Sequence, residues 1–166
     1  FTQYQLHLDL INTLVQEYPA GTKVADNQGL IPLFLCTMRE DATAEICRVL
    51  CKANPDGPNT KNKTGSYPLH FAAKRHRPNL DILQILLRRN PTAAGCMNSF
   101  GLLPIHCISG LSDNVKAVKM IHEADPESVK VRICNSFLYA RVVVVLITSR
   151  WQGYVILLAS DVLSLI

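Results

Sequence analysis

Apolar residues recur along this chain at the three-to-four-residue spacing of an amphipathic helix, and the arrangement returns every 36 residues (Leu14, Leu50, Leu86). The clearest stretch is 80–89, LDILQILLRR, which we expect to be a helix with Asn79 as its N-cap. Two apolar slots keep a fixed distance from a proline that recurs along the chain. The slot five residues before this proline contains Leu14, Leu50, Leu86 and Ile121. The slot eight residues before it contains Ile11, Cys47, Leu83 and Val118. These slots are predicted to form a buried stripe.

Glycine and proline repeat with the same period. The phrases GLIPLFLC, GSYPLHFA and GLLPIHCI begin at Gly29, Gly65 and Gly101. A second series of marker prolines consists of Pro19, Pro55 and Pro91, followed one residue early by Pro126. Two independent markers with one period indicate a tandem array of one supersecondary unit, which typically forms an extended surface.

The middle copy predicts the conformation of each unit. Its polar segment 61–65 ends in a glycine, which suits a tight turn with positive φ. Pro68 then fits the first turn of a short helix, in which Leu69, Ala72 and Ala73 give a face of small residues. A break at 75–78 precedes the longer second helix. Each unit is therefore predicted to contain a turn, a short helix, a loop and a longer helix, and stacking buries the apolar stripes.

The predicted fold class is an all-α solenoid of stacked helix-turn-helix repeats. Its organisation is a partial unit at 1–28 with a second helix and turn, full units at 29–64, 65–100 and 101–136, and a hydrophobic, non-repeat tail at 137–166. Three units are about the number that such an array needs for stability. The chain begins without Met inside a predicted helix, so we expect it to be a fragment or an incomplete gene model.

The phrases YPLHFA at 67–72 and LPIH at 103–106 resemble the ankyrin-repeat signature T-P-L-H-x-A. The resemblance covers roughly residues 4–136 and implies an ankyrin-type α-solenoid. It also implies that the signature histidines are structural, with each imidazole tying the turn to backbone groups. The structural signature residues are Gly29, Pro32, Leu33, Gly65, Pro68, Leu69, His70, Gly101, Pro104, Ile105 and His106.

Some positions depart from the family pattern. The period of 36 residues (Gly65 to Gly101) exceeds the family's roughly 33. The threonine before the signature proline is replaced by Ile31, Tyr67 and Leu103, so we predict that the hydroxyl cap is absent. Phe34 stands where the first full unit should have histidine.

No motif for catalysis or for a cofactor is found in the chain. The sequence has no phosphate-binding Gly-rich loop with lysine, no nucleophile elbow and no His–Glu metal helix. The resemblance instead implies a non-catalytic protein–protein interaction module, a scaffold or adaptor. We therefore predict neither catalysis, cofactor nor metal.

The cysteines raise the question of a metal site. Cys47 and Cys51 are four residues apart on one predicted helix face, but Cys96, Cys107 and Cys134 are scattered and form no CxxC pair. The pair also occupies apolar slots of the repeat. We therefore predict buried free thiols, which indicates a reducing, intracellular location in the cytoplasm or nucleus.

One basic cluster is a candidate partner-binding site. It contains Lys61, Lys63, Lys74, Arg75, His76 and Arg77. In the resembling family the turn tips and first helices line the concave binding face, so the cluster would lie there. An ordinary solvated surface is the simpler interpretation of the cluster. If the cluster is functional, an acidic protein segment is the favoured partner, and a nucleic acid or a phosphoinositide surface fits less well.

The repeat markers stop after Phe137, and the segment 138–166 has three charges in an apolar, β-branched stretch. Three interpretations of this segment are open. It is a membrane-inserted segment, although Arg150 and Gln152 interrupt it, or a β-hairpin that turns near Gln152 and Gly153. The third interpretation is translation past an exon boundary or out of frame. Two further functions therefore stay open: a membrane-anchored ankyrin protein, and a regulatory arm of an enzyme whose catalytic domain lies elsewhere.

Overall fold

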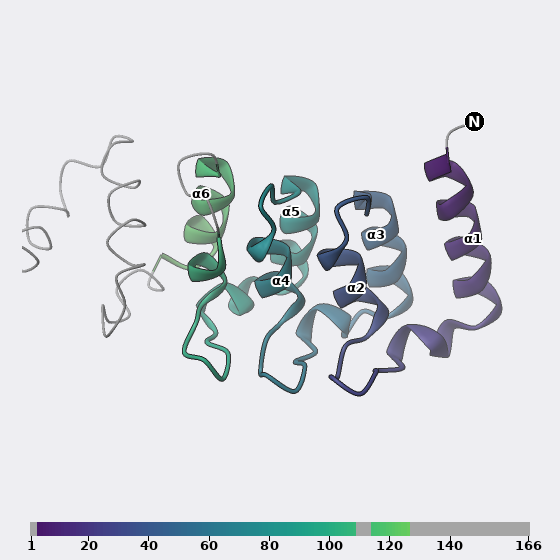
Figure 1. Ribbon diagram of the computed structural model, residues 1–166, viewed down its shortest axis with the longest axis horizontal. Helices are drawn as coiled ribbons and strands as arrows, with labels where there is room; N and C mark the ends of the chain where they lie inside the picture. Colours follow the sequence, from purple (N-terminus) through teal and green to yellow (C-terminus); the bar gives the residue numbers. More distant parts are fainter. Residues whose placement is uncertain (1–2, 109–113, 127–166) are drawn as a thin grey trace, which may run out of the picture.

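The computed structural model describes residues 3–108 and 114–126, and the regular secondary structure in these ranges is helical, without a strand. The α-helices are α1 (Gln3–Glu17), α2 (Pro32–Met38), α3 (Ala44–Ala53), α4 (Pro68–Lys74), α5 (Leu80–Arg89) and α6 (Val115–Ala124). The 3-10 helices are η1 (Pro19–Lys23), η2 (Gly57–Asn59), η3 (Pro91–Gly95) and η4 (Pro104–Cys107). Figure 1 shows the units side by side, with α3 next to α2, α5 next to α4, and α1 and α6 at the two ends of the labelled helices. The ankyrin-type solenoid predicted from the sequence is therefore present.

The second helices begin at side-chain caps. The Asn79 side-chain oxygen accepts from the N–H groups of Asp81 (3.1 Å) and Ile82 (3.2 Å), as predicted. At the start of α3, the Thr43 hydroxyl accepts from the N–H of Ile46 at 3.4 Å. These bonds satisfy N–H groups that have no partner within the helix.

Each first helix begins at its signature proline, because a missing N–H costs nothing at the first helical position. No side chain caps these helices through a hydroxyl, which confirms the prediction for Ile31, Tyr67 and Leu103. In the third full unit the described part of the first helix is only the 3-10 helix η4.

The turns between units use glycine for its left-handed conformation. Gly29, Gly65 and Gly101 have φ of 76°, 69° and 71°. A Cβ at Gly29 would also lie 3.0 Å from the backbone nitrogen of Lys63. Neighbouring turns approach so closely because they are bonded: the Lys63 N–H donates to the Gln28 carbonyl at 3.0 Å, and this contact recurs between the next two turns.

The apolar stripe is buried where both helices of a unit are present. Leu50, Leu86 and Ile121 are 7%, 1% and 0% exposed. The prediction of burial is wrong for the copy of this slot on α1, since Leu14 is 58% exposed. Ile11 is only partly buried. The reason is that no first helix among the described residues lies in front of α1.

The predictions for residues 127–136 and for the tail at 137–166 fall outside the described residues, and so does the segment 109–113 of the third full unit. Within the described ranges, no helix combines the length and the apolar character needed to cross a bilayer. The membrane and hairpin alternatives for 138–166 stay untested.

Candidate protein-binding face

The turn tips are organised by a side chain that sequence analysis missed. The Asn62 side-chain oxygen accepts from the N–H groups of Thr64 (3.1 Å) and Ser66 (2.9 Å), closing the loop around Gly65. Asp26 and Asn98 do the same in the neighbouring turns. The 36-residue spacing of these three residues was the available signal. The bonds give the tips a defined shape and so position the lysines on them.

The signature histidine joins one unit to the next. His70 is 2% exposed, and its Nδ1 accepts from the N–H of Tyr67 at 3.1 Å. Its Nε2 then carries the proton and donates to the Leu102 carbonyl at 3.1 Å. His106 repeats the first bond with the N–H of Leu103 at 3.0 Å. These bonds agree with the structural role that the family resemblance implied.

Burial keeps both imidazoles neutral. Desolvation lowers the pKa of His70, and it lowers the pKa of His106 to about 4, with a smaller contribution from the neighbouring His70 imidazole. The ordinary histidine value is 6.5. A neutral ring with an accepting Nδ1 is what the turn requires, since protonation would remove that acceptor.

His106 should therefore make the fold sensitive to acid. Because the pKa of His106 is lower in the folded protein, the unfolded chain takes up the proton at a higher pH than the folded protein does. The contribution of His106 to the free energy of unfolding is therefore complete above pH 6.5 and is lost as the pH falls toward about 4. We expect the urea midpoint of the parent to fall more between pH 7 and about pH 4.5 than that of His106→Phe. Phenylalanine is the matched replacement because Phe34 occupies this slot. Equal falls in the two proteins would contradict the assignment.

Buried asparagines form a second connection between units, which sequence analysis also missed. Asn54 and Asn90 are 6% and 5% exposed. Their amide nitrogens donate to the carbonyls of Thr22 (3.2 Å) and Pro58 (3.1 Å), 32 residues earlier in each case. Their position directly before the marker proline was the available signal.

Cys47 and Cys51 are free and 0% exposed, which confirms the prediction of buried free thiols. Cys36, on the facing helix, is free and 5% exposed. Within residues 3–108 and 114–126, no three or more His, Cys, Asp or Glu side chains are arranged to hold a metal ion.

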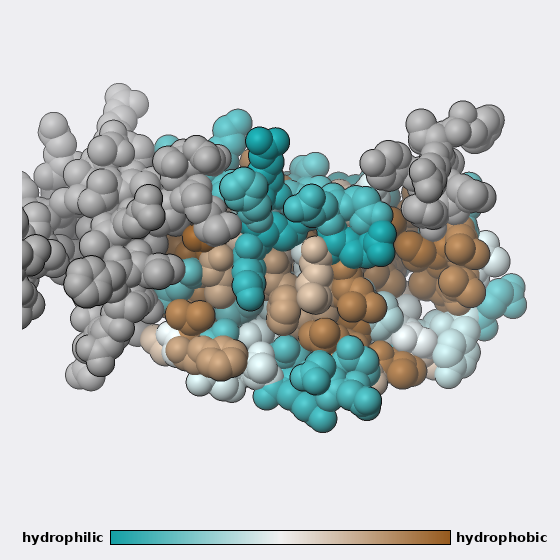
Figure 2. Space-filling model, viewed as in Figure 1, coloured by the Kyte–Doolittle hydropathy of each residue, from teal (hydrophilic) through white to brown (hydrophobic). Residues whose placement is uncertain are grey.

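The basic cluster divides into two groups in space. Lys61 and Lys63, here called the tip group, are exposed on the turn before α4. The rim group, at the opposite end of α4, consists of Lys74, His76 and Arg77, all exposed. Seven helical residues, about 10 Å, separate the groups. Figure 2 shows hydrophilic surface above and below a more apolar middle on this face.

Three apolar or aromatic residues belong to the first helices between the two groups: Leu35 on α2, and Tyr67 and Phe71 at the start and in the middle of α4. Leu35 is 49% exposed, and the two aromatic residues are partly buried. The Phe71 ring packs edge-on against Phe34, with centroids 5.4 Å apart. The Lys61 ammonium lies 5.1 Å from the centroid of the Tyr67 ring, which links the tip group to the row. We name Leu35, Tyr67 and Phe71 the apolar row.

Arg75 differs from the rest of the cluster because its guanidinium turns inward. Its Nε and Nη1 atoms are buried and have no hydrogen-bond partner. Its charge acts on the thiol of Cys36, which places the guanidinium beside the first full unit. Arg75 is thus less available to a partner than the sequence cluster implied.

No ion pair of the described residues involves the tip group or the rim group. The ion pairs in these ranges join Arg39 to Asp41 and Arg48 to Glu45. The positive potential at both ends of the apolar row is therefore unneutralised by nearby described side chains.

A comparison with protein families agrees with this architecture. The family model described as ankyrin repeats, in three copies, matches residues 2–93, which is more than half of the chain. The chain is an ankyrin-repeat protein. Ankyrin repeats act as protein–protein interaction modules, and the family is generally non-catalytic. A comparison with curated proteins finds no match to this ankyrin-repeat protein.

Proposed function

We propose that this ankyrin-repeat protein is a scaffold or adaptor that binds an acidic protein segment across α2 and α4. The observation that supports this most is the apolar row with an unneutralised basic group at each end. Depletion of charge at the centre of a patch, with polar residues at its rim, is typical of protein-binding surfaces.

The spacing of the groups defines the partner's chemistry. An extended chain advances about 3.3–3.6 Å per residue, so about three residues would span the length of α4. The partner segment would place leucine or aromatic side chains on the apolar row and carboxylates on the tip and rim groups. A nucleic acid is a less suitable partner. A surface that binds nucleic acid typically has a continuous basic stripe along the phosphates, whereas apolar side chains separate the two basic groups on this face.

A peptide assay tests the proposal on the full chain. The probe is a fluorescein-labelled peptide with a central Leu-Tyr-Leu flanked by glutamates, followed by fluorescence polarisation and stopped flow. We expect the double variant Lys61→Glu/Lys63→Glu to slow association by about tenfold or more and to remove most of its salt dependence. Arg75 is left unchanged, because a carboxylate with its buried position would perturb the fold.

The matched control reverses two lysines of equal charge on another helix. Lys116 and Lys119 are exposed on α6, so reversing both gives the same net charge change. We expect this control to bind like the parent, and a peptide with Gln in place of Glu to bind weakly. Equal slowing by both double variants would reduce the effect to net charge and overturn the site. A labelled single-stranded RNA that binds better than the peptide would overturn the partner class.

A further inference from the structure

Arg75 has a counterpart in the first full unit. It is the C-cap of α4, and Arg39 is the C-cap of α2. The two arginines are 36 residues apart, which is one period of the array. Both have extended backbone, with ψ of 146° for Arg75 and 134° for Arg39. The array therefore presents the same side chain from the same place in two neighbouring units, and only the surroundings of each guanidinium differ.

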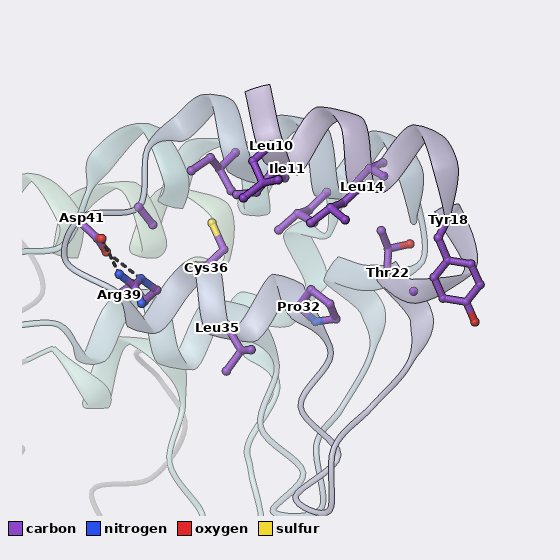
Figure 3. A pocket seen from close by; sticks show the side chains of 15 residues that line it. Leu10, Ile11, Leu14, Tyr18, Thr22, Pro32, Leu35, Cys36, Arg39 and Asp41 are labelled. Atoms are coloured by element: carbon purple, nitrogen blue, oxygen red, sulfur yellow. Dashed lines mark hydrogen bonds and ion pairs between the residues drawn. The ribbon is translucent and has the colours of Figure 1, made fainter. Parts of the chain in front are cut away.

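Arg39 has a carboxylate partner within its own unit. Its Nε donates to one oxygen of Asp41 at 2.8 Å, and its Nη2 donates to the other oxygen at 2.5 Å. Figure 3 shows these bonds as dashed lines between the two side chains. This arrangement matches the planar fork of a guanidinium to the two oxygens of a carboxylate. An arginine at this C-cap can thus hold a carboxylate with two bonds.

The second full unit lacks the corresponding carboxylate. Arg77 stands one period after Asp41, so the residue in the partner position has the same charge as Arg75. The Nε and Nη1 atoms of Arg75 are buried and have no hydrogen-bond partner. The ion pairs of the described residues do not include this arginine. A buried donor without a partner is unfavourable, and a charged one is more so.

The outward direction is also unfavourable for Arg75 in the free protein. The Arg39 side chain points outward and is 67% exposed. In the same direction, the guanidinium of Arg75 would approach the exposed cations Lys74 and Arg77, which repel it. A carboxylate from outside the chain would remove both costs, because it would pair with the outward guanidinium and offset the repulsion. An arginine side chain changes rotamer fast enough to respond to such a ligand.

We propose that Arg75 binds a carboxylate of the partner segment, from an aspartate or glutamate side chain, through two bonds like those between Arg39 and Asp41. The guanidinium turns outward when this carboxylate arrives, and the charges of Lys74 and Arg77 add to the attraction. This inference rests on the proposed function, and it assigns the acidic residue at the rim end of the segment to one arginine. A carboxylate is preferred to a phosphate because the chain itself places a carboxylate on the equivalent arginine.

The stability of the free protein gives the first test. Arg75→Met keeps the apolar stem and removes the unpaired donors, so we expect the urea midpoint to stay the same or to rise. Arg39→Met is the matched control, because it removes an exposed arginine that has a partner, and its midpoint should stay the same or fall slightly. If Arg75→Met lowers the midpoint more than Arg39→Met does, Arg75 already has a partner in the free protein and the proposal is wrong.

Binding of the fluorescein-labelled glutamate peptide to the full chain gives the second test. Lysine keeps the charge of arginine but lacks the planar fork, so Arg75→Lys should weaken binding by about fivefold or more. Arg77→Lys makes the same change at the exposed neighbour, and we expect it to change Kd by less than about twofold. Equal weakening by both variants would show that the fork of Arg75 has no special part and would overturn the proposal.

Two further peptides locate the carboxylate. Each has Gln in place of the glutamates on one side of Leu-Tyr-Leu. We expect Arg75→Lys to have no effect on the peptide that lacks the carboxylate bound by Arg75, and its full effect on the other, because the two changes remove the same interaction. Full weakening with both peptides would contradict the pairing. Tighter binding of a peptide with phosphoserine in place of the glutamates, reversed by Arg75→Lys, would overturn the choice of a carboxylate.

A nitrogen-15 spectrum of the arginine side chains shows the change at the residue itself. The Nε–H signal of Arg75 is assigned by its loss in Arg75→Lys. We expect the glutamate peptide to move this signal and to leave that of Arg39 in place, since Arg39 stays paired with Asp41. An Arg75 signal that stays in place while the peptide binds would count against the proposal.

These outcomes separate this inference from the proposed function. If Lys61→Glu/Lys63→Glu slows association while Arg75→Lys binds like the parent, the binding face stands and the carboxylate site on Arg75 is wrong. If no glutamate peptide binds the parent, both are wrong.

Discussion

Replacing Leu86 with alanine is expected to lower the free energy of unfolding by about 2–5 kcal/mol. Leu86 is 1% exposed and belongs to α5, which packs against both α3 and α6. Truncation would remove buried apolar area and leave a cavity between three helices that neighbouring side chains cannot fill without moving. A loss of this size is a large part of the stability of a short array. Urea denaturation followed by circular dichroism measures it.

The matched control is the same substitution in the same slot of α1. Leu14 is 58% exposed, so Leu14→Ala should change the free energy of unfolding by about 0.5 kcal/mol or less. The two variants share their chemistry and repeat position and differ in whether a first helix covers the side chain. Similar losses from both would show that the slot, rather than its covering helix, determines the effect.

This contrast shows where the sequence pattern is sufficient and where it is not. The glycine conformation and the limits of α5 follow from local chemistry, and the structure has them as predicted. Burial depends in addition on what lies opposite a residue. The pattern places Leu14 and Leu86 in the same slot, but their burial differs because no first helix among the described residues lies in front of α1.

The candidate site was predictable in part for a similar reason. The sequence places Lys61 and Lys63 on a turn and Lys74 at the end of a short helix, and the structure has them there. One feature depends on contacts between units and could not be read from the pattern, namely the inward direction of the Arg75 guanidinium.

His70→Ala is expected to lower the free energy of unfolding by about 2–5 kcal/mol. The imidazole is buried and engages two backbone groups, the Tyr67 N–H in its own unit and the Leu102 carbonyl in the next. Alanine would leave both groups without a partner, at about 1–3 kcal/mol for each buried polar group, and would add a cavity. Urea denaturation measures the total loss, and amide hydrogen exchange at Tyr67 reports the broken bond.

His70→Phe separates the two contributions, because phenylalanine fills the space but accepts no hydrogen bond. Phe34 shows that the slot tolerates this ring, being 0% exposed. We expect His70→Phe to recover part of the stability lost in His70→Ala, while the Tyr67 amide exchanges faster than in the parent in both variants. If the Tyr67 amide stays as protected in His70→Phe as in the parent, the imidazole is not its partner. If both variants are as stable as the parent, the histidine is not what joins the units, and the buried amides of Asn54 and Asn90 would then be the principal connection.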